Sequence, residues 1–482
     1  MQITTPDWVK HAIFYQIFPD RFARTQRTDL PPEMQVPFEP WDSPPTVHGY
    51  KGGDLWGIAE NLDYLQDLGI TAIYFTPIFQ SASNHRYHTH DYYKIDPLLG
   101  GNQAFQDLLQ AAHSRNIKVV LDGVFNHASR GFFYFNDILE NGDKSPWLDW
   151  FKINQWPLYA YDDSQPNNYE AWWNLPALPQ FNHDNAHARE YIMRIGEYWI
   201  AQGADGWRLD VPEEIQTEGF WAEFRSRVKA VNPDAYIVGE IWTDASEWLQ
   251  GDQFDGVMNY LFTGPVVAFA AQENADQSFA HQVAYPTYSA MDAKGYAEKI
   301  DSLLNLYDWE VQQTQLNLLS SHDVVRSLTM VSEDLTSLSL AILLLMTFPG
   351  APSIYYGDEV GVAGGKDPDC RRSFPSKEHW NQSLLQQYKD LIALRKSYKA
   401  LRTGKYQTLA AEGNCYVFSR LLETEMVIVA LNAGKETVQI RLADIAMKHG
   451  ELLYGKGEIE WLGDRTAMLE IPARSGMVLG NK

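Results

Sequence analysis

The sequence predicts an α/β protein built on a parallel (β/α)₈ barrel, a TIM barrel. Short apolar runs rich in β-branched and aromatic residues alternate with helical patterns, as such a barrel requires. Four of these runs end in clusters of Asp, Glu, His or Asn, in LDGVFNH, GADGWRLD, YIVGEIW and NLLSSHD. Parallel barrels present functional groups at the carboxyl ends of their strands. The expected strands are residues 13–18, 70–76, 118–124, 206–210, 236–241, 257–260, 316–320 and 353–356.

Two segments depart from this alternation. Between residues 128 and 181 the chain becomes rich in Trp, Tyr, Asn, Pro and Asp, and we interpret it as a subdomain inserted after the third strand. From about residue 401, short alternating strands such as CYVFSRL, MVIVALN and TVQIRLA favour a C-terminal antiparallel β-sandwich domain. The expected domains are therefore a barrel of residues 1–127 and 182–400, an inserted subdomain of 128–181, and a β-sandwich of 401–482.

The composition is that of a large globular chain with an acidic surface. The 482 residues are 45% hydrophobic, which is ample material for a buried core, and the formal net charge is −23. This charge disfavours nucleic acid and anionic membrane surfaces as partners. The longest apolar stretch, residues 338–348, is interrupted by polar residues and is too short to cross a bilayer, so we expect a buried barrel helix there.

The cysteines and the beginning of the chain favour a location inside the cell. Cys370 and Cys415 are too few for a disulfide framework, so we expect reduced thiols. The first residues, MQITTPDWVKHAIFYQIF, contain neither a sustained apolar core nor a small-residue cleavage site. We therefore expect no signal peptide and a cytoplasmic protein.

Arg208 and Asp210 are the first candidates for chemistry. Residues two apart on a strand share one face, so this guanidinium and this carboxylate are expected side by side at the barrel mouth. The opposite charge would keep the carboxylate ionised, as a nucleophile requires. Taken singly, an R-x-D pair is more often a structural ion pair, and Glu240, His127 or His322 is more often a core residue. The four strand ends taken together favour a catalytic site.

The ordered motifs resemble those of the α-amylase family of glycoside hydrolases, over nearly the whole chain from residue 13 onward. This resemblance implies that Asp210 is the nucleophile and Glu240 the general acid and base. It implies that Asp323 is a third carboxylate, which holds sugar hydroxyls and favours the distorted ring. The residues implied to support the same sugar are His127, Arg208 and His322.

The implied mechanism is that of a retaining glycosidase, in which two carboxyl groups lie roughly 5 Å apart and one of them forms a covalent glycosyl intermediate. Glu240 must then be protonated near neutral pH. Crowding by Asp210 and Asp323, together with burial beside Trp242, would raise its pKa accordingly. No metal or organic cofactor is required for these steps.

A finer resemblance is to the cyclomaltodextrinase, maltogenic amylase and neopullulanase group. The motifs that carry it are YQIFPDRF, GGDLWGI, LGITAIYFTPIF and YYGDEVG followed by GGKDPDCRR. The resemblance implies that Asp367 and Arg371 hydrogen-bond the sugar undergoing cleavage and that Tyr87 is an aromatic platform beneath it. The spacing of Asp367 and Arg371 fits a surface i,i+4 pair equally well. Enzymes of this group cleave α-1,4 and often α-1,6 links, so the implied substrates are short α-glucans such as cyclodextrins, maltooligosaccharides and pullulan.

Two departures from the group concern the acceptor side of the site and the beginning of the chain. After the nucleophile the group typically has Val-Ala-Asn-Glu, whereas this chain has Val211, Pro212, Glu213 and Glu214. These positions are implied to face the acceptor side, so they bear on the balance of α-1,4 and α-1,6 cleavage. The group usually carries an N-terminal β-domain that takes part in dimer formation. This chain begins almost at the first barrel strand, so any homodimer is expected to use another surface.

A third departure concerns calcium. Asp54 and the glycines before it resemble half of a calcium site of this group. The partner loop, ARTQRTD, lacks the usual Asn-Gly-Asp ligands. Calcium takes about six oxygens or more, and the sequence nominates too few of them. No metal ligand set is therefore assigned.

Other functions remain open at this stage. A glucanotransferase would use the same three carboxylates, and an oligo-1,6-glucosidase or debranching enzyme would differ only on the acceptor side. A non-catalytic carbohydrate or transporter-associated protein on the same barrel would be expected to lack the carboxylates or to carry a membrane anchor. Several tryptophans could stack on sugar rings but more often fill cores: Trp147, Trp150, Trp156, Trp172 and Trp173.

Overall fold

A closed eight-stranded barrel is the centre of the computed structural model, which describes residues 3–162, 164–279, 290–423, 425–463 and 465–481. Neighbouring strands are all parallel, in the order β1-β10-β9-β8-β7-β6-β5-β2. The predicted barrel is thus confirmed, with strand ends that differ from the expected ones by at most two residues. The strands are β1 Phe14–Ile17, β2 Ala72–Phe75, β5 Lys118–Gly123, β6 Gly206–Leu209, β7 Tyr236–Gly239, β8 Gly256–Asn259, β9 Leu316–Leu318 and β10 Ala351–Tyr355.

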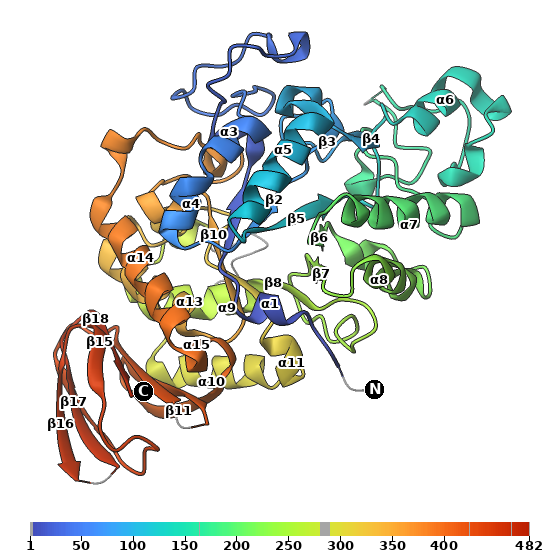
Figure 1. Cartoon of the computed structure of the whole chain (residues 1–482). Coiled ribbons are helices and arrows are strands. Elements are labelled where there is room, and N and C mark those ends of the chain that lie inside the picture. Colours follow the sequence, from blue (N-terminus) through green and yellow to red (C-terminus); the bar gives the residue numbers. More distant parts are fainter. Residues whose placement is uncertain (1–2, 163, 280–289, 424, 464, 482) are drawn as a thin grey trace.

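Helices surround the barrel (Figure 1). Because helices cover the outside and side chains fill the inside, almost every strand residue is buried, as is typical of parallel sheets. The expected buried helix at residues 338–348 is confirmed as part of α13, Leu335–Thr347. The side chain of Asp334 caps the start of this helix by accepting hydrogen bonds from the N–H groups of Thr336 and Ser337. The longer barrel helices are α5 Gly101–Ser114, α7 Ala186–Ala201, α8 Phe220–Val231, α9 Tyr260–Ala271, α10 Ala293–Leu304, α13 Leu335–Thr347 and α14 Gln382–Ser397.

Shorter elements complete the barrel layer. They include a two-stranded antiparallel sheet after β2 and several helices of one or two turns. These elements are α1 Asp7–Lys10, α2 Pro19–Phe22, α3 Leu55–Glu60, α4 Leu62–Leu68, β3 Phe79–Ser81, β4 Thr89–Ile95, α11 Trp309–Gln312, α12 Ser327–Met330 and α15 Lys399–Thr403.

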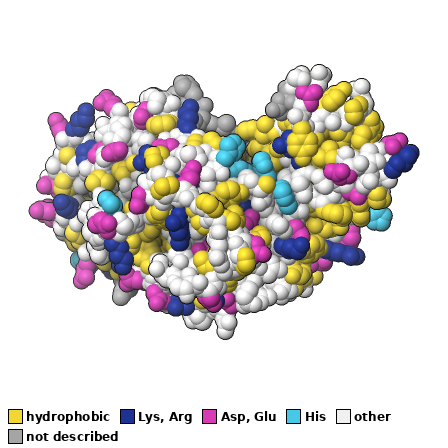
Figure 2. All heavy atoms as spheres, turned by 90° about the horizontal axis from the view of Figure 1, so that it is seen from above, with side chains coloured by type: hydrophobic (Ala, Val, Ile, Leu, Met, Phe, Trp, Pro, Cys, Tyr) yellow, Lys and Arg dark blue, Asp and Glu magenta, His cyan; other side chains and the backbone are white. Residues whose placement is uncertain are grey.

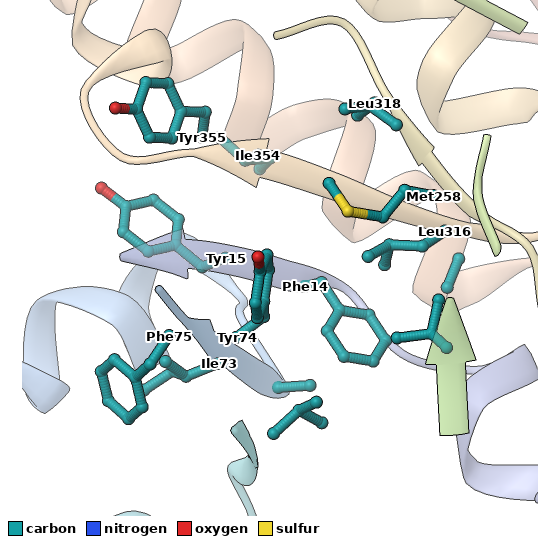
Figure 3. Packing of buried hydrophobic residues seen from close by; sticks show 14 of the residues in the cluster. Phe14, Tyr15, Ile73, Tyr74, Phe75, Met258, Leu316, Leu318, Ile354 and Tyr355 are labelled. Carbon is teal, nitrogen blue, oxygen red and sulfur yellow. The ribbon is translucent and has the colours of Figure 1, made fainter. Parts of the chain in front are cut away.

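The barrel interior is packed with large apolar side chains. Figure 3 shows side chains of β1, β2, β8, β9 and β10 packed against one another, with Phe14 and Tyr74 among them. Such filling leaves the strand ends, rather than the barrel centre, as the place where a ligand can bind. Seen from above, the molecule is hollowed between two lobes, and His side chains gather beside the hollow (Figure 2).

The segment between β5 and α7 lies beside the barrel (Figure 1). It contains α6 Phe133–Asn141, short 3₁₀ turns and isolated β-bridges, one of which pairs Phe151 with Phe181. Aromatic side chains hold it together: Tyr134 stacks on Trp147 at 4.0 Å between ring centroids and meets Trp150 edge-on at 4.7 Å. Trp147 and Trp150 therefore pack within this segment.

Two antiparallel sheets follow the barrel, as predicted for the C-terminal part. Their strand orders are β11-β12-β13-β18-β15 and β14-β17-β16. On β12, Cys415 and Val417 belong to the core between these two sheets, whereas Tyr416 and Phe418 belong to the core shared with the barrel. Both cysteines are free and buried. The strands are β11 Lys405–Glu412, β12 Cys415–Leu422, β13 Glu425–Asn432, β14 Val438–Leu442, β15 Glu451–Gly455, β16 Glu458–Gly463, β17 Thr466–Ile471 and β18 Ser475–Gly480.

Arg420 of β12 ties the C-terminal sheets to the barrel layer. Its guanidinium is fully buried and donates to the carbonyl oxygens of Thr347, Leu401 and Gly404 at 2.7 to 3.2 Å. Thr347 ends α13, so the positive charge also faces the carbonyl end of a helix.

In the part of the chain that is described, no helix combines the length and apolar character needed to cross a membrane.

We predict that Arg420→Met destabilises the protein by about 3 kcal/mol, because the buried carbonyl groups of Thr347 and Gly404 lose their donor, whereas that of Leu401 keeps Arg395. Urea unfolding followed by tryptophan fluorescence measures the change. Arg441→Met on β14 removes an exposed guanidinium and serves as the control. Equal effects of the two changes would contradict this role of Arg420.

Candidate active site

Three neighbouring strand ends, those of β5, β6 and β7, bring the central residues together. The register pairs Asp122 on β5 with Arg208 on β6, and Arg208 with Val238 on β7, two residues before Glu240. Asp210 follows the end of β6 directly. The guanidinium of Arg208 therefore lies among acidic side chains of three strands.

Arg208 is the centre of the cluster. It is fully buried, and its Nη1 lies 2.9 Å from both Asp122 Oδ1 and Asp210 Oδ1. Its Nη2 lies 2.7 Å from Glu240 Oε1, although the angle there is not that of a directed hydrogen bond. The guanidinium thus contacts three carboxyl groups. Burial lowers its pKa, but the charges of Asp122 and Glu240 outweigh burial and raise it well above its usual value. One positive group holds three acids together.

Asp122 was missed by the sequence analysis, although it lies in the quoted motif LDGVFNH. It is 1% exposed, and besides Arg208 it accepts hydrogen bonds from the hydroxyl groups of Tyr74 and Tyr87 at 3.1 and 3.0 Å. The sequence signal that could have identified Asp122 is an acid within an otherwise apolar run of the strand. Such an acid must be paired with a buried donor or cation.

Burial raises the pKa of the acids in this cluster. It raises the pKa of Asp210 to about 7, because the lowering effect of Arg208 is smaller than the cost of burying the charge, and the charges of Asp122 and Asp323 add to the increase. The pKa of Glu240 is raised well above its usual range, first by burial and then by the charges of Asp210 and Asp323, against Arg208. The expectation that Arg208 keeps Asp210 fully ionised is therefore wrong: Arg208 lowers the pKa of Asp210, but burial raises it by more.

A hydrogen-bonded chain connects His322 to the cluster. Gln16 Nε2 lies 2.8 Å from His322 Nδ1, and Tyr87 Oη lies 2.5 Å from His322 Nε2. Burial and the charges of Arg371 and Arg208 lower the pKa of His322 well below its usual range, so the ring is neutral. An amide N–H donating to Nδ1 places the ring proton on Nε2, which donates to Tyr87, which in turn donates to Asp122.

Asp323 lies at the mouth of the site. Its side chain is 28% exposed, with Oδ2 at 3.0 Å from His322 Nε2 and Oδ1 at 3.4 Å from Arg371 Nη2. Arg371 also lies 3.1 Å from Asp367 and donates to the main-chain oxygen of His322. The structure thus places Asp367 and Arg371 beside the strand-end cluster.

His127 lies under a stack of aromatic rings. Its ring is 1% exposed and lies 5.3 Å from the ring of Trp172, which stacks on Trp173 at 4.4 Å. His127 Nε2 and Trp172 Nε1 have no hydrogen-bond partner among the described residues. Burial lowers the pKa of His127 to about 3, so this ring is also neutral. The outer ring, Trp173, is 72% exposed, and Trp156 is 38% exposed.

The backbone after Asp210 is strained. Val211 has φ 35° and ψ 51°, in the left-handed region that β-branched residues rarely adopt. This conformation directs the Val211 N–H to Glu240 Oε2 at 3.3 Å. The 3₁₀ turn η6, Pro212–Glu214, follows and contains Glu213 and Glu214. Strain at a position next to a carboxyl cluster is typical of functional sites.

Trp242 stacks face to face on Tyr260, with centroids 3.9 Å apart. The Tyr260 hydroxyl lies 3.1 Å from Ser321 Oγ, so the pair joins the ends of β7, β8 and β9. Glu240 precedes Trp242 by two residues and is 4% exposed. This aromatic pair provides part of the apolar surroundings expected near the acid.

Asp54 does not fit a calcium ion with the described residues around it. Its Oδ1 accepts the N–H of Gly57, as the N-cap of α3, and its Oδ2 accepts the N–H of Thr25, both at 2.8 Å. Both carboxylate oxygens of Asp54, which a calcium ion would need as ligands, thus already accept a hydrogen bond from a backbone N–H group. Asp54 thus links the loop after α2 to α3, and among the described residues no group of three or more His, Cys, Asp or Glu is arranged to hold a metal.

A barrel mouth with buried carboxyl groups around one guanidinium defines a carboxylate-based site of the kind that glycoside hydrolases use. The family model "Alpha amylase, catalytic domain" matches residues 16–378, and "Alpha-amylase C-terminal domain" matches residues 404–479. The chain therefore belongs to the α-amylase family and is a glycoside hydrolase.

Characterised relatives cover most of the chain. It is 42% identical to a cyclomaltodextrinase of Geobacillus thermopakistaniensis, over 90% of this chain and 71% of that protein. It is 41% identical to neopullulanase 2 of Thermoactinomyces vulgaris, over 99% of this chain and 79% of that protein. The crystal structure of a debranching enzyme from Nostoc punctiforme is 59% identical, with a TM-score of 0.94 over the full length of both chains.

We predict that Asp210→Asn makes the protein more stable at alkaline pH. The folded-state pKa of about 7 lies above the unfolded value of about 3.9, so Asp210 contributes stability that is present below pH 4 and is lost as pH rises through 7. Removing the charge avoids this loss, which is on the order of 4 kcal/mol at pH 8, or roughly 4 °C in Tm.

Thermal unfolding between pH 5 and pH 8.5 measures this difference, which should shrink as the pH falls. Asp252→Asn, at an exposed position, removes the same charge without burial and is the control. An Asp210→Asn variant that is less stable than the parent at pH 8 would contradict the effect ascribed to burial.

Proposed function

We propose that the enzyme hydrolyses α-glucosidic bonds in short and branched α-glucans, with Asp210 as nucleophile and Glu240 as general acid and base. The observation that best supports these roles is the shared guanidinium, whose neighbouring nitrogens lie 2.9 and 2.7 Å from the two carboxyl groups. Carboxyl groups held on one guanidinium lie near each other, which supports a retaining pair, whose carboxyl groups are about 5–5.5 Å apart.

In the first step, an ionised Asp210 oxygen attacks the anomeric carbon while Glu240 donates its proton to the departing glycosidic oxygen. With a pKa of about 7, about half of Asp210 is ionised at neutral pH, and this ionised form is the nucleophile. The pKa of Glu240 is raised well above its usual range, which supports a protonated acid. Environments that raise two carboxyl pKa values to different extents are typical of such pairs.

In the second step, the ionised Glu240 takes a proton from water, the water oxygen attacks the anomeric carbon, and Asp210 leaves. These steps use only carboxyl groups of the chain and water. The neutral rings of His127 and His322 and the carboxylate of Asp323 are suited to hold hydroxyl groups of the same sugar. Arg371 and Asp367 would hold that sugar from the loop after β10.

The relatives support both α-1,4 and α-1,6 bonds as targets. They are named as a cyclomaltodextrinase, a neopullulanase and a debranching enzyme, and the last of these shares 59% of its residues over the full chain. We therefore favour branched maltooligosaccharides, in which the leaving group is itself a glucan chain. The acidic turn with Glu213 and Glu214, next to the proposed acid, lies where such a leaving group departs.

We predict that Asp210→Asn and Glu240→Gln each lower turnover on the order of 10⁴-fold while the protein remains folded. The two variants differ on α-maltosyl fluoride, because fluoride leaves without a proton. Glu240→Gln should still release a stoichiometric burst of fluoride, whereas Asp210→Asn should release none. A fluoride burst from Asp210→Asn would remove it from the nucleophile position.

Product analysis with β-cyclodextrin, pullulan and a branched maltooligosaccharide tests the substrate class. We expect cleavage of the branched substrate with α-configured reducing ends in the first ¹H NMR spectra, because two displacements retain the configuration. The Asp210→Asn variant is the control for contaminating activity. Initial release of the β-anomer would contradict the covalent intermediate.

A further inference from the structure

Gln16 is a buried amide that takes no part in the two displacement steps. It lies on β1, is 2% exposed and shares its strand face with Phe14, which packs inside the barrel (Figure 3). In the register of the barrel it pairs with Tyr74 of β2 and Tyr355 of β10, so both neighbouring strands fix its position. From there its Nε2 reaches Nδ1 of His322, in the segment after β9, at 2.8 Å.

The ring of His322 is held from several sides. It is fully buried and lies parallel to the ring of Tyr87, with 5.5 Å between centroids and 4° between planes. The main-chain oxygen of His322 accepts from Arg371 Nε at 2.9 Å. The charged and titratable side chains around the ring are Tyr87, His85, Arg208, Asp323 and Arg371. This packing fixes the plane of the ring, so what remains to be set is which nitrogen carries the proton.

The amide of Gln16 sets that choice. An amide nitrogen only donates, so Nδ1 of His322 accepts and the single proton of the neutral ring lies on Nε2. This Nε2 lies 2.5 Å from Tyr87 Oη and 3.0 Å from Asp323 Oδ2. In the opposite tautomer its lone pair would face both oxygens. The one hydroxyl proton of Tyr87 would then turn to the ring and leave Asp122 Oδ2, to which it now donates at 3.0 Å.

We propose that Gln16 is a positioning residue, whose amide keeps His322 protonated on Nε2 so that His322 meets a sugar hydroxyl as a donor and Asp323 meets it as an acceptor. The proposal rests on the function proposed above, in which these two side chains hold the sugar. The same tautomer keeps the Tyr87 hydroxyl directed at Asp122. One amide on β1 thus sets the direction of a series of hydrogen bonds that ends at the acid cluster.

Gln16→Glu tests this role, because it keeps the shape of the side chain and makes it titratable. While the carboxyl group and the ring share one proton between them, Nε2 of His322 keeps its own. Once that shared proton is lost, the carboxylate accepts from Nδ1–H and Nε2 becomes an acceptor. The ratio of parent to variant kcat/KM on a branched maltooligosaccharide should therefore rise about tenfold between pH 5.5 and pH 8.5. A carboxylate acting only by its charge would raise the pKa of Glu240 and give the opposite trend.

The matched control is Gln312→Glu, the same change at an amide that is 1% exposed and donates to the carbonyl oxygen of Leu303 at 2.6 Å. It should keep the parent's pH profile. Gln16→Met removes the donor without adding a titratable group, so it should lower kcat/KM about fivefold at every pH, and it guards against misfolding of Gln16→Glu. A parent-shaped pH profile in Gln16→Glu, or parent-like kcat/KM in Gln16→Met, would overturn the role of Gln16. Failure of the parent to cleave the branched substrate would instead overturn the proposed function.

Discussion

The site depends on one buried positive charge. Arg208 lies inside the barrel mouth without exposure to solvent, and the acids of β5, β6 and β7 lie around it. A guanidinium at this depth requires carboxylates, and carboxylates at this depth require the guanidinium, because either charge alone would be far too costly to bury. There are more acids than the one cation can neutralise. Burial first, and then this excess negative charge, leave Asp210 and Glu240 with raised pKa values, and this is the property that acid–base chemistry near neutral pH needs.

The surrounding scaffold holds this unfavourable arrangement in place. The register of the parallel strands places Asp122 beside Arg208. A series of hydrogen bonds from Gln16 through His322 and Tyr87 ends at Oδ2 of Asp122 and holds that oxygen in place. The strands are buried on both faces, so they have little freedom to relax around a repulsive cluster. The C-terminal sheets support the barrel layer from outside, where Arg420 satisfies carbonyl groups at the end of α13.

The leaving-group side follows from the same geometry. The left-handed conformation of Val211 turns the chain against Glu240 and then into η6, whose last residue, Glu214, lines a polar pocket. One strained residue thus follows the proposed nucleophile and contacts the proposed acid. The acidic residues of this turn, Glu213 and Glu214, are where the sequence departs from the group that it resembles. Differences in linkage preference within the family are expected at such positions, because the catalytic carboxyl groups themselves are shared.

The sequence by itself determined the barrel, the positions of its strands and the residues at the strand ends. These are local signals: apolar runs of strand length, and polar residues placed where the runs end. The tertiary structure alone decided which groups meet. Asp122 was hidden inside an apolar strand until the register placed it beside Arg208, and the ring stack on His127 and the polar pocket at Glu214 are built from segments far apart in the chain. The pKa of Asp210 belongs to this second class, because burial outweighs the neighbouring arginine, and burial is a property of the folded chain rather than of the R-x-D motif.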